Sequence, residues 1–173
     1  MFNTEKSIEL LNSARHEYLN DLQLIKGYLF LNKKQKVEQI IDRVTEKLNN
    51  QSRLAHLHIP ECAAFLMQFR WSSHAFSLIF EVDGPERDLS VYDTELMETF
   101  REYFTIIERY SAPIVDNTLR VVIETEPVLR IHLYFEGEMV NQRTATEQLN
   151  KQNVNRSFQW VEHYKINNEC DTR

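Results

Sequence analysis

The chain is poor in glycine, with three among 173 residues, and these three lie far apart at Gly27, Gly84 and Gly137. Folds that wrap nucleotide phosphates in a glycine-rich loop need several glycines close together, so the sequence argues against such a loop. Cysteine is also scarce, and Cys62 and Cys170 are the only two. We expect both to be reduced thiols in a cytosolic protein; a single bridge between them is the alternative.

Long apolar runs and an excess of basic residues are missing as well. No stretch approaches the roughly 20 apolar residues that cross a bilayer, and Met1 to Lys6 lack the basic start and apolar run of a signal peptide. We therefore expect a cytoplasmic protein with no membrane partner. The formal net charge of −6 argues against nucleic acid as a partner, because binding to its backbone needs a basic face.

What the sequence does contain falls into two regions, with a break near His58-Ile59-Pro60 that predicts domains at 1–58 and 59–173. In the first region apolar residues recur every three or four positions, as in amphipathic helices. They are Leu11, Ala14, Tyr18, Leu22, Ile25 and Leu29 before a basic turn at 32–36, and Val37, Ile41, Val44, Leu48 and Ala55 after it. This pattern predicts a helical hairpin.

A hairpin of two helices buries little apolar surface by itself. Further apolar residues widen its apolar zone beyond a single seam, namely Ile8, Leu10, Leu19, Leu24 and Ile40. Pairing two hairpins about a twofold axis would complete a four-helix bundle, so we predict a homodimer. The alternative is that the hairpin packs on its own C-terminal half.

The second region has a mixed pattern. It predicts helices at 61–69 and 92–110, strands at 76–82, 119–124 and 129–135, and a final strand around 158–166. The strands at 119–124 and 129–135 are expected to form a hairpin, while 141–155 is either a surface helix or a loop. The order predicts an α+β domain, a sheet with helices on one face.

His16 is the residue that points to chemistry. At about 100° per residue it lies roughly 160° from the stripe through Leu11, which we take as the buried direction. Asn20, Gln23 and Gly27 follow at steps of four, three and four, so the four residues form one exposed ridge.

Two neighbouring features favour a functional histidine over an ordinary solvated one. Gly27 costs a helix about 1 kcal/mol relative to alanine, and the missing side chain would let another molecule approach the ridge. Glu17 is adjacent to His16, where its carboxylate would orient the imidazole.

A longer motif surrounds these residues: Arg15-His16-Glu17-x-x-Asn20-x-Leu22-Gln23-Leu24-Ile25-x-Gly27. It resembles the phospho-acceptor helix of two-component signalling proteins and, more narrowly, the sporulation initiation phosphotransferase B family, which is related to citrate- and malate-sensing histidine kinases. The similarity continues through the basic turn into Phe69-Arg70-Trp71 and residues 88–93.

The resemblance implies a dimeric four-helix bundle that carries the histidine, and a C-terminal α/β sandwich similar to a degenerate histidine-kinase ATPase domain. Kinase ATPase domains carry an asparagine-rich helix for magnesium and glycine loops for the nucleotide. The expected helix at 92–110 has no asparagine, and the glycines are isolated. We therefore expect a histidine phosphotransferase without autokinase activity.

The resemblance also implies partners and roles. The phosphoryl group would pass from a phosphorylated single-domain response regulator to His16, and then to a response-regulator transcription factor that controls sporulation. No cofactor or metal of the chain's own is expected, because Mg²⁺ would be held by the regulator. We assign catalytic roles to His16, Glu17 and Asn20, and regulator binding to Arg15, Gln23, Leu24, Lys26 and Gly27.

Two other functions remain open from the sequence. One is a non-catalytic dimeric adaptor that binds and sequesters a response regulator, for which His16 would be dispensable. The other is a degenerate sensor kinase with weak ATP chemistry, against which the isolated glycines argue.

Overall fold

The structure is a computed structural model that describes residues 4–152 and 156–166, so Cys170 lies outside the described residues. The chain forms two compact units, Met1–Ser52 and Arg53–Arg173. Arg53 belongs with the second unit, where its guanidinium donates hydrogen bonds to the backbone carbonyls of Val82 and Gly84.

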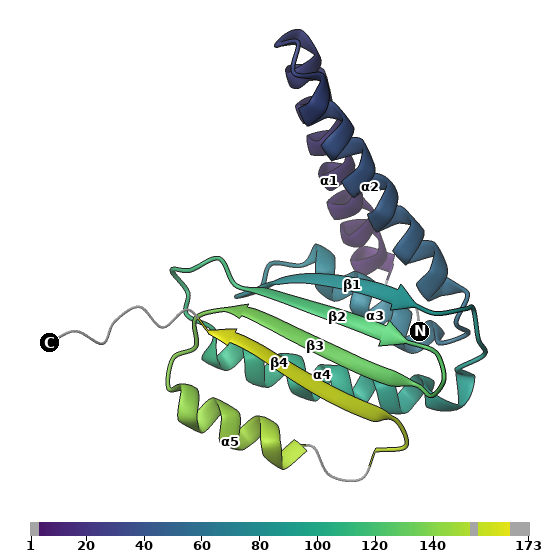
Figure 1. Cartoon of the computed structure of the whole chain (residues 1–173), viewed down its shortest axis with the longest axis vertical. Coiled ribbons are helices and arrows are strands. Elements are labelled where there is room, and N and C mark those ends of the chain that lie inside the picture. The colour runs from purple at the N-terminus through teal and green to yellow at the C-terminus, as the bar shows by residue number, and fades with distance from the viewer. Residues whose placement is uncertain (1–3, 153–155, 167–173) are drawn as a thin grey trace, which may run out of the picture. The chain divides into compact units, whose positions relative to one another are not determined.

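The first unit is a hairpin of two antiparallel helices, as the apolar spacing predicts (Figure 1). Helix α1 spans Thr4–Phe30 and helix α2 begins at Lys34, running to Ala55. Between them Asn32 adopts a left-handed conformation with φ of 54°, and the backbone amide of Lys33 donates to the carbonyl of Tyr28. Asparagine tolerates this conformation better than most residues, which allows the short reversal.

The face that α1 turns toward α2 differs from the one chosen from the sequence. Leu11, Leu22 and Leu29 are 70%, 60% and 54% exposed, whereas Asp21 is buried. At about 100° per residue, the leucine stripe lies roughly a quarter turn from Asp21. Since α1 has one neighbouring helix within its unit, it buries one narrow face and leaves the stripe open to solvent.

The second unit contains a four-stranded mixed sheet in the order β1-β2-β3-β4. Strand β1 (Ser77–Asp83) runs parallel to β2 (Thr118–Glu124), which is antiparallel to β3 (Arg130–Gly137). Strand β4 (Gln159–Ile166) runs parallel to β3. The predicted hairpin and final strand are confirmed, and the unit is α+β.

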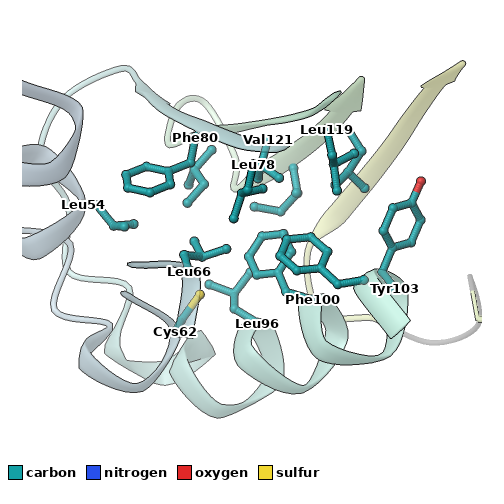
Figure 2. Close-up of a cluster of buried hydrophobic side chains, with 14 of the residues drawn as sticks. Leu54, Cys62, Leu66, Leu78, Phe80, Leu96, Phe100, Tyr103, Leu119 and Val121 are labelled. Carbon is teal, nitrogen blue, oxygen red and sulfur yellow. The ribbon is translucent and has the colours of Figure 1, made fainter. Parts of the chain in front are cut away.

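Helices cover one face of this sheet, and alternate strand residues point into the resulting core (Figures 1 and 2). Around the sheet lie α3 (Pro60–Trp71), the short 3₁₀ helix η1 (Ser90–Tyr92), α4 (Asp93–Tyr110) and α5 (Gln142–Gln152). The core includes Leu66, Phe80, Phe100, Leu119 and Val121, each nearly inaccessible to solvent. Of the stretch 141–155, which the sequence predicts as either a surface helix or a loop, residues 142–152 form the helix α5, and 153–155 lie outside the described residues.

Cys62 is one of these core side chains, pointing from α3 into the apolar cluster (Figure 2). Burial raises the pKa of its thiol, and the nearby charge of Asp93 raises it further. Among the residues that the structure describes, none of the helices has the length and apolar character that crossing a bilayer requires.

Candidate functional site

The predicted ridge exists on the solvent side of α1. His16, Asn20, Gln23 and Gly27 are all exposed, as their spacing of about one helical turn each requires. The ridge lies roughly 130° from Asp21, the residue of α1 that is buried against α2. An incoming molecule therefore meets the imidazole of His16 without any rearrangement of the hairpin.

Packing within the helical hairpin does not explain why residue 27 is a glycine. A Cβ built on it would meet no neighbouring atom within 4 Å apart from its own helical turns, in the described part of the chain. Its φ is not in the left-handed region either, so no turn requires a glycine there. Gly84 and Gly137 differ, because both have positive φ and a Cβ at either would collide with Thr125 or Asn117.

The groups beside the ridge are also accessible. Leu24 is 46% exposed, an apolar side chain facing solvent one position after Gln23. Arg15 and Lys26 are exposed on the other flank of α1, roughly 100° from His16 and Gly27 respectively. All of the predicted regulator-binding residues are therefore exposed, but they do not share one face: Arg15 and Lys26 lie about 40° from Leu11 and Leu22, and Leu24 lies on the opposite flank of the ridge.

Glu17 has a different environment from the other predicted site residues. Its carboxylate accepts a hydrogen bond from Nζ of Lys47 on α2, at 2.8 Å. The same ammonium group bonds Asp21 at 3.1 Å, and Arg43 donates to the other oxygen of Asp21 at 2.7 Å. The orientation of His16 by Glu17 stays a prediction, since Glu17 is held toward α2.

This ionic cluster of Glu17, Asp21, Arg43 and Lys47 was missed by the sequence reasoning. A signal for it is present, because the acids are four residues apart on α1 and the bases four apart on α2. Such spacings place each pair on one helix face, and antiparallel pairing then brings opposite charges together. Tyr18 adds a hydrogen bond across the hairpin to Gln51 at 3.2 Å.

The described residues offer no alternative metal centre. Within residues 4–152 and 156–166, no three His, Cys, Asp or Glu side chains gather in a group that would hold an ion. Two histidines of the second unit have carboxylate partners: His132 Nε2 lies 3.0 Å from Glu124, and His74 Nδ1 lies 3.4 Å from Glu108.

Comparison with known proteins identifies a family for the chain. Two family models match the chain: the "Sensor kinase SpoOB-type, alpha-helical domain" over residues 1–57, and "Sporulation initiation phospho-transferase B, C-terminal" over residues 58–171. A relative from Bacillus subtilis (strain 168), sporulation initiation phosphotransferase B, is 34% identical over 134 residues. The match covers 77% of this chain and 70% of that protein.

Proposed function

We propose, from the premise that this chain belongs to the sporulation initiation phosphotransferase B family, that His16 is its phosphoryl acceptor. Membership makes the chain a phosphorelay phosphotransferase in the initiation of sporulation. The observation that carries the residue assignment is the exposed ridge, on which a nucleophilic side chain and an unexplained helical glycine share one accessible face.

The chemistry needs little from this chain beyond a positioned imidazole. A ring nitrogen of His16 attacks phosphorus, a new N–P bond forms, and the O–P bond of the regulator's aspartyl phosphate breaks. The bonding electron pair leaves with the aspartate as a carboxylate, while the proton on the other ring nitrogen stays or passes to solvent. Since both bonds are high in energy, the step runs in either direction.

The transition state is loose, so alignment and charge neutralisation account for most of the catalysis. We assign neutralisation to Mg²⁺ in the acidic pocket of the response regulator, with no metal held by this chain. Asn20, Gln23, Leu24 and Gly27 form the docking surface, which presents amide groups, one leucine and a stretch of bare backbone. Arg15 and Lys26 attract the acidic rim of the regulator.

The partners follow from this chemistry and the family. The donor is a phosphorylated single-domain response regulator, and the acceptor is a response-regulator transcription factor controlling sporulation. Both would dock on the same ridge in turn, in the cytoplasm. The second unit carries no nucleotide chemistry in this proposal.

The active form is a homodimer in which two hairpins complete a four-helix bundle. The exposed stripe of Leu11, Leu22 and Leu29 lies a quarter turn from the seam with α2, as expected of a bundle helix with two neighbours. Ile41 and Leu48 are exposed at 46% and 44% on the corresponding face of α2. By helical geometry both sets face the same side of the hairpin, away from the His16 ridge.

Phosphoryl transfer from a radiolabelled, phosphorylated single-domain response regulator tests the acceptor. Label is expected on the wild-type chain and at least 100-fold less on His16→Ala, since no other group supplies the nucleophile. The label should be lost in acid and stable in base, as a phosphoramidate is. His56→Ala, which removes another exposed histidine, serves as the matched control and should label normally. Binding of the regulator without any label on the wild type would instead support the sequestering adaptor.

A further inference from the structure

Lys47 is a cation largely withdrawn from water. Its side chain is 12% exposed, and its ammonium group is shared between Glu17 at 2.8 Å and Asp21 at 3.1 Å. An ammonium group in such a place is stable only when anions surround it. Its burial therefore ties its charge to these two carboxylates rather than to solvent ions.

Both carboxylates belong to the part of α1 that carries the acceptor. Glu17 follows His16 directly, and Asp21 lies one helical turn beyond Glu17. Asp21 is 11% exposed at its side chain and Glu17 31% exposed, so water screens neither fully. Together with Arg43, the cluster holds two negative and two positive charges and is formally neutral.

The transfer reaction changes charge at this place. Forming the N–P bond on His16 brings at least one unit of negative charge from the regulator's aspartate to α1, and the broken O–P bond leaves a carboxylate behind on the regulator. If the proton on the other ring nitrogen goes to solvent, a second unit of negative charge is added. Whatever charge already surrounds His16 therefore contributes to the transfer equilibrium.

We propose that Lys47 sets how favourably His16 holds a phosphoryl group, by neutralising Glu17 and Asp21 from the facing helix. The proposal rests on His16 being the acceptor. Lys47 is here a positioning residue that acts through electrostatics and touches neither the phosphoryl group nor the regulator. Without it, the cluster would carry one net negative charge beside the phosphorylated imidazole.

Arg43 provides the internal comparison. It bonds the same Asp21 at 2.7 Å, but its side chain is 61% exposed, against 12% for Lys47. Solvent screens an exposed charge far more strongly than a buried one. Arg43 also lies one helical turn farther from Glu17 along α2. Loss of the Arg43 charge should consequently affect His16 less.

The equilibrium between labelled regulator and labelled His16 tests this directly, in the full chain. Lys47→Met removes the positive charge and keeps an unbranched apolar side chain of similar length. It should lower the equilibrium constant for transfer onto His16 by about twofold to tenfold, which is the Coulomb effect of one unit charge roughly 10 Å away. Glu17→Gln, which leaves Lys47 paired with Asp21, should raise it. The double variant should return to within about twofold of wild type.

The controls separate this electrostatic role from a structural one. Damage to the fold alone would slow transfer in both directions and leave the equilibrium constant unchanged, and it would not be rescued by Glu17→Gln. Arg43→Gln should change the constant by less than about twofold because that charge is screened. Should Lys47→Met fail to fold, comparison of Glu17→Gln with the double variant isolates the charge of Lys47, and a constant no lower in the double variant overturns the proposal.

An unchanged equilibrium constant in both single variants, or a double variant no better than Lys47→Met, overturns the proposal while leaving His16 as acceptor. A wild-type chain that takes no label, or a His16→Ala chain that takes as much, overturns the acceptor and this inference together.

Discussion

Gly27 lies inside α1, where glycine costs about 1 kcal/mol relative to alanine because the unfolded backbone has more freedom to lose. The hairpin leaves open the space that a methyl group would fill, so packing does not account for the glycine. The residue shares the ridge with His16, where a missing side chain permits close approach of another backbone. Stability and docking thus make opposite demands at one position.

Gly27→Ala is expected to raise the free energy of unfolding by about 1 kcal/mol and to weaken regulator binding by about tenfold, since the added methyl group occupies the docking surface. Urea unfolding followed by circular dichroism gives the first quantity, and titration of the regulator gives the second. Gln39→Ala, an exposed change on α2, is the matched control for helix propensity. A stabilised variant that binds and transfers as well as wild type would show that the ridge does not require the glycine.

At the scale of residues, helical periodicity was enough to predict the ridge. His16, Asn20, Gln23 and Gly27 share a face of α1 by local geometry, and the motif around them identified the family. Periodicity did not identify which face of α1 meets α2. Which face is buried depends on the partner helix. The ion pairs of Lys47 with Glu17 and Asp21 favour a contact face that contains charged residues, and a search for apolar residues alone does not find such a face.

Strands β2 and β3 carry a second charge cluster on the outer face of the sheet. Glu124 accepts from Arg130 at 2.7 Å and lies 3.0 Å from His132 Nε2. Arg130 is the direct cross-strand partner of Glu124, and His132 lies opposite Val122. The hydrogen bond with His132 is the main reason that the pKa of Glu124 falls below its ordinary value, and Arg130 lowers it further.

This lowered pKa predicts that the stability contributed by the β2–β3 pair decreases in acid. A carboxyl group whose pKa is lower in the folded state contributes stability above its unfolded pKa of about 4.3, and that contribution is lost as pH falls through the folded pKa. The difference in unfolding free energy between wild type and Glu124→Gln should therefore shrink between about pH 6 and pH 3. Urea unfolding at both pH values measures it, with Glu138→Gln, an exposed acid just after β3, as control. A difference that stays constant with pH would assign the effect to packing.

Elements were predictable wherever one physical signal dominated. Alternating apolar residues in 119–124 and 129–135 predicted β2 and β3, and the structure pairs them in antiparallel register. The polar stretch that forms α5 has no such signal, because only Ala145 and Leu149 of its described side chains are buried. Its two buried residues are one turn apart, and only the tertiary fold shows that they meet a core.

For the whole molecule, the main feature that remains to be explained is the apolar surface that the helical hairpin exposes to solvent. On α1, Leu11, Leu22 and Leu29 form a stripe and are 54–70% exposed. Large exposed apolar patches on soluble proteins mark interaction sites, so this stripe is not expected to stay open to solvent in a monomer. The second unit has its own closed core and needs no such cover. A twofold axis along the leucine stripe would bury it against itself, leaving the two His16 ridges on outer surfaces.

Leu22→Lys should accordingly separate the dimer. Burying one leucine contributes about 1.5–3 kcal/mol, and twofold symmetry counts it twice, so the dissociation constant should rise at least about 100-fold. Size-exclusion chromatography with light scattering over a range of concentrations measures it. Asn49→Lys adds the same charge on the polar side of α2 and should leave the dimer intact. A wild-type chain that is monomeric throughout refutes the four-helix bundle. A Leu22→Lys chain that stays dimeric refutes this face while leaving the bundle possible, because another side of the hairpin would then have to make the contact.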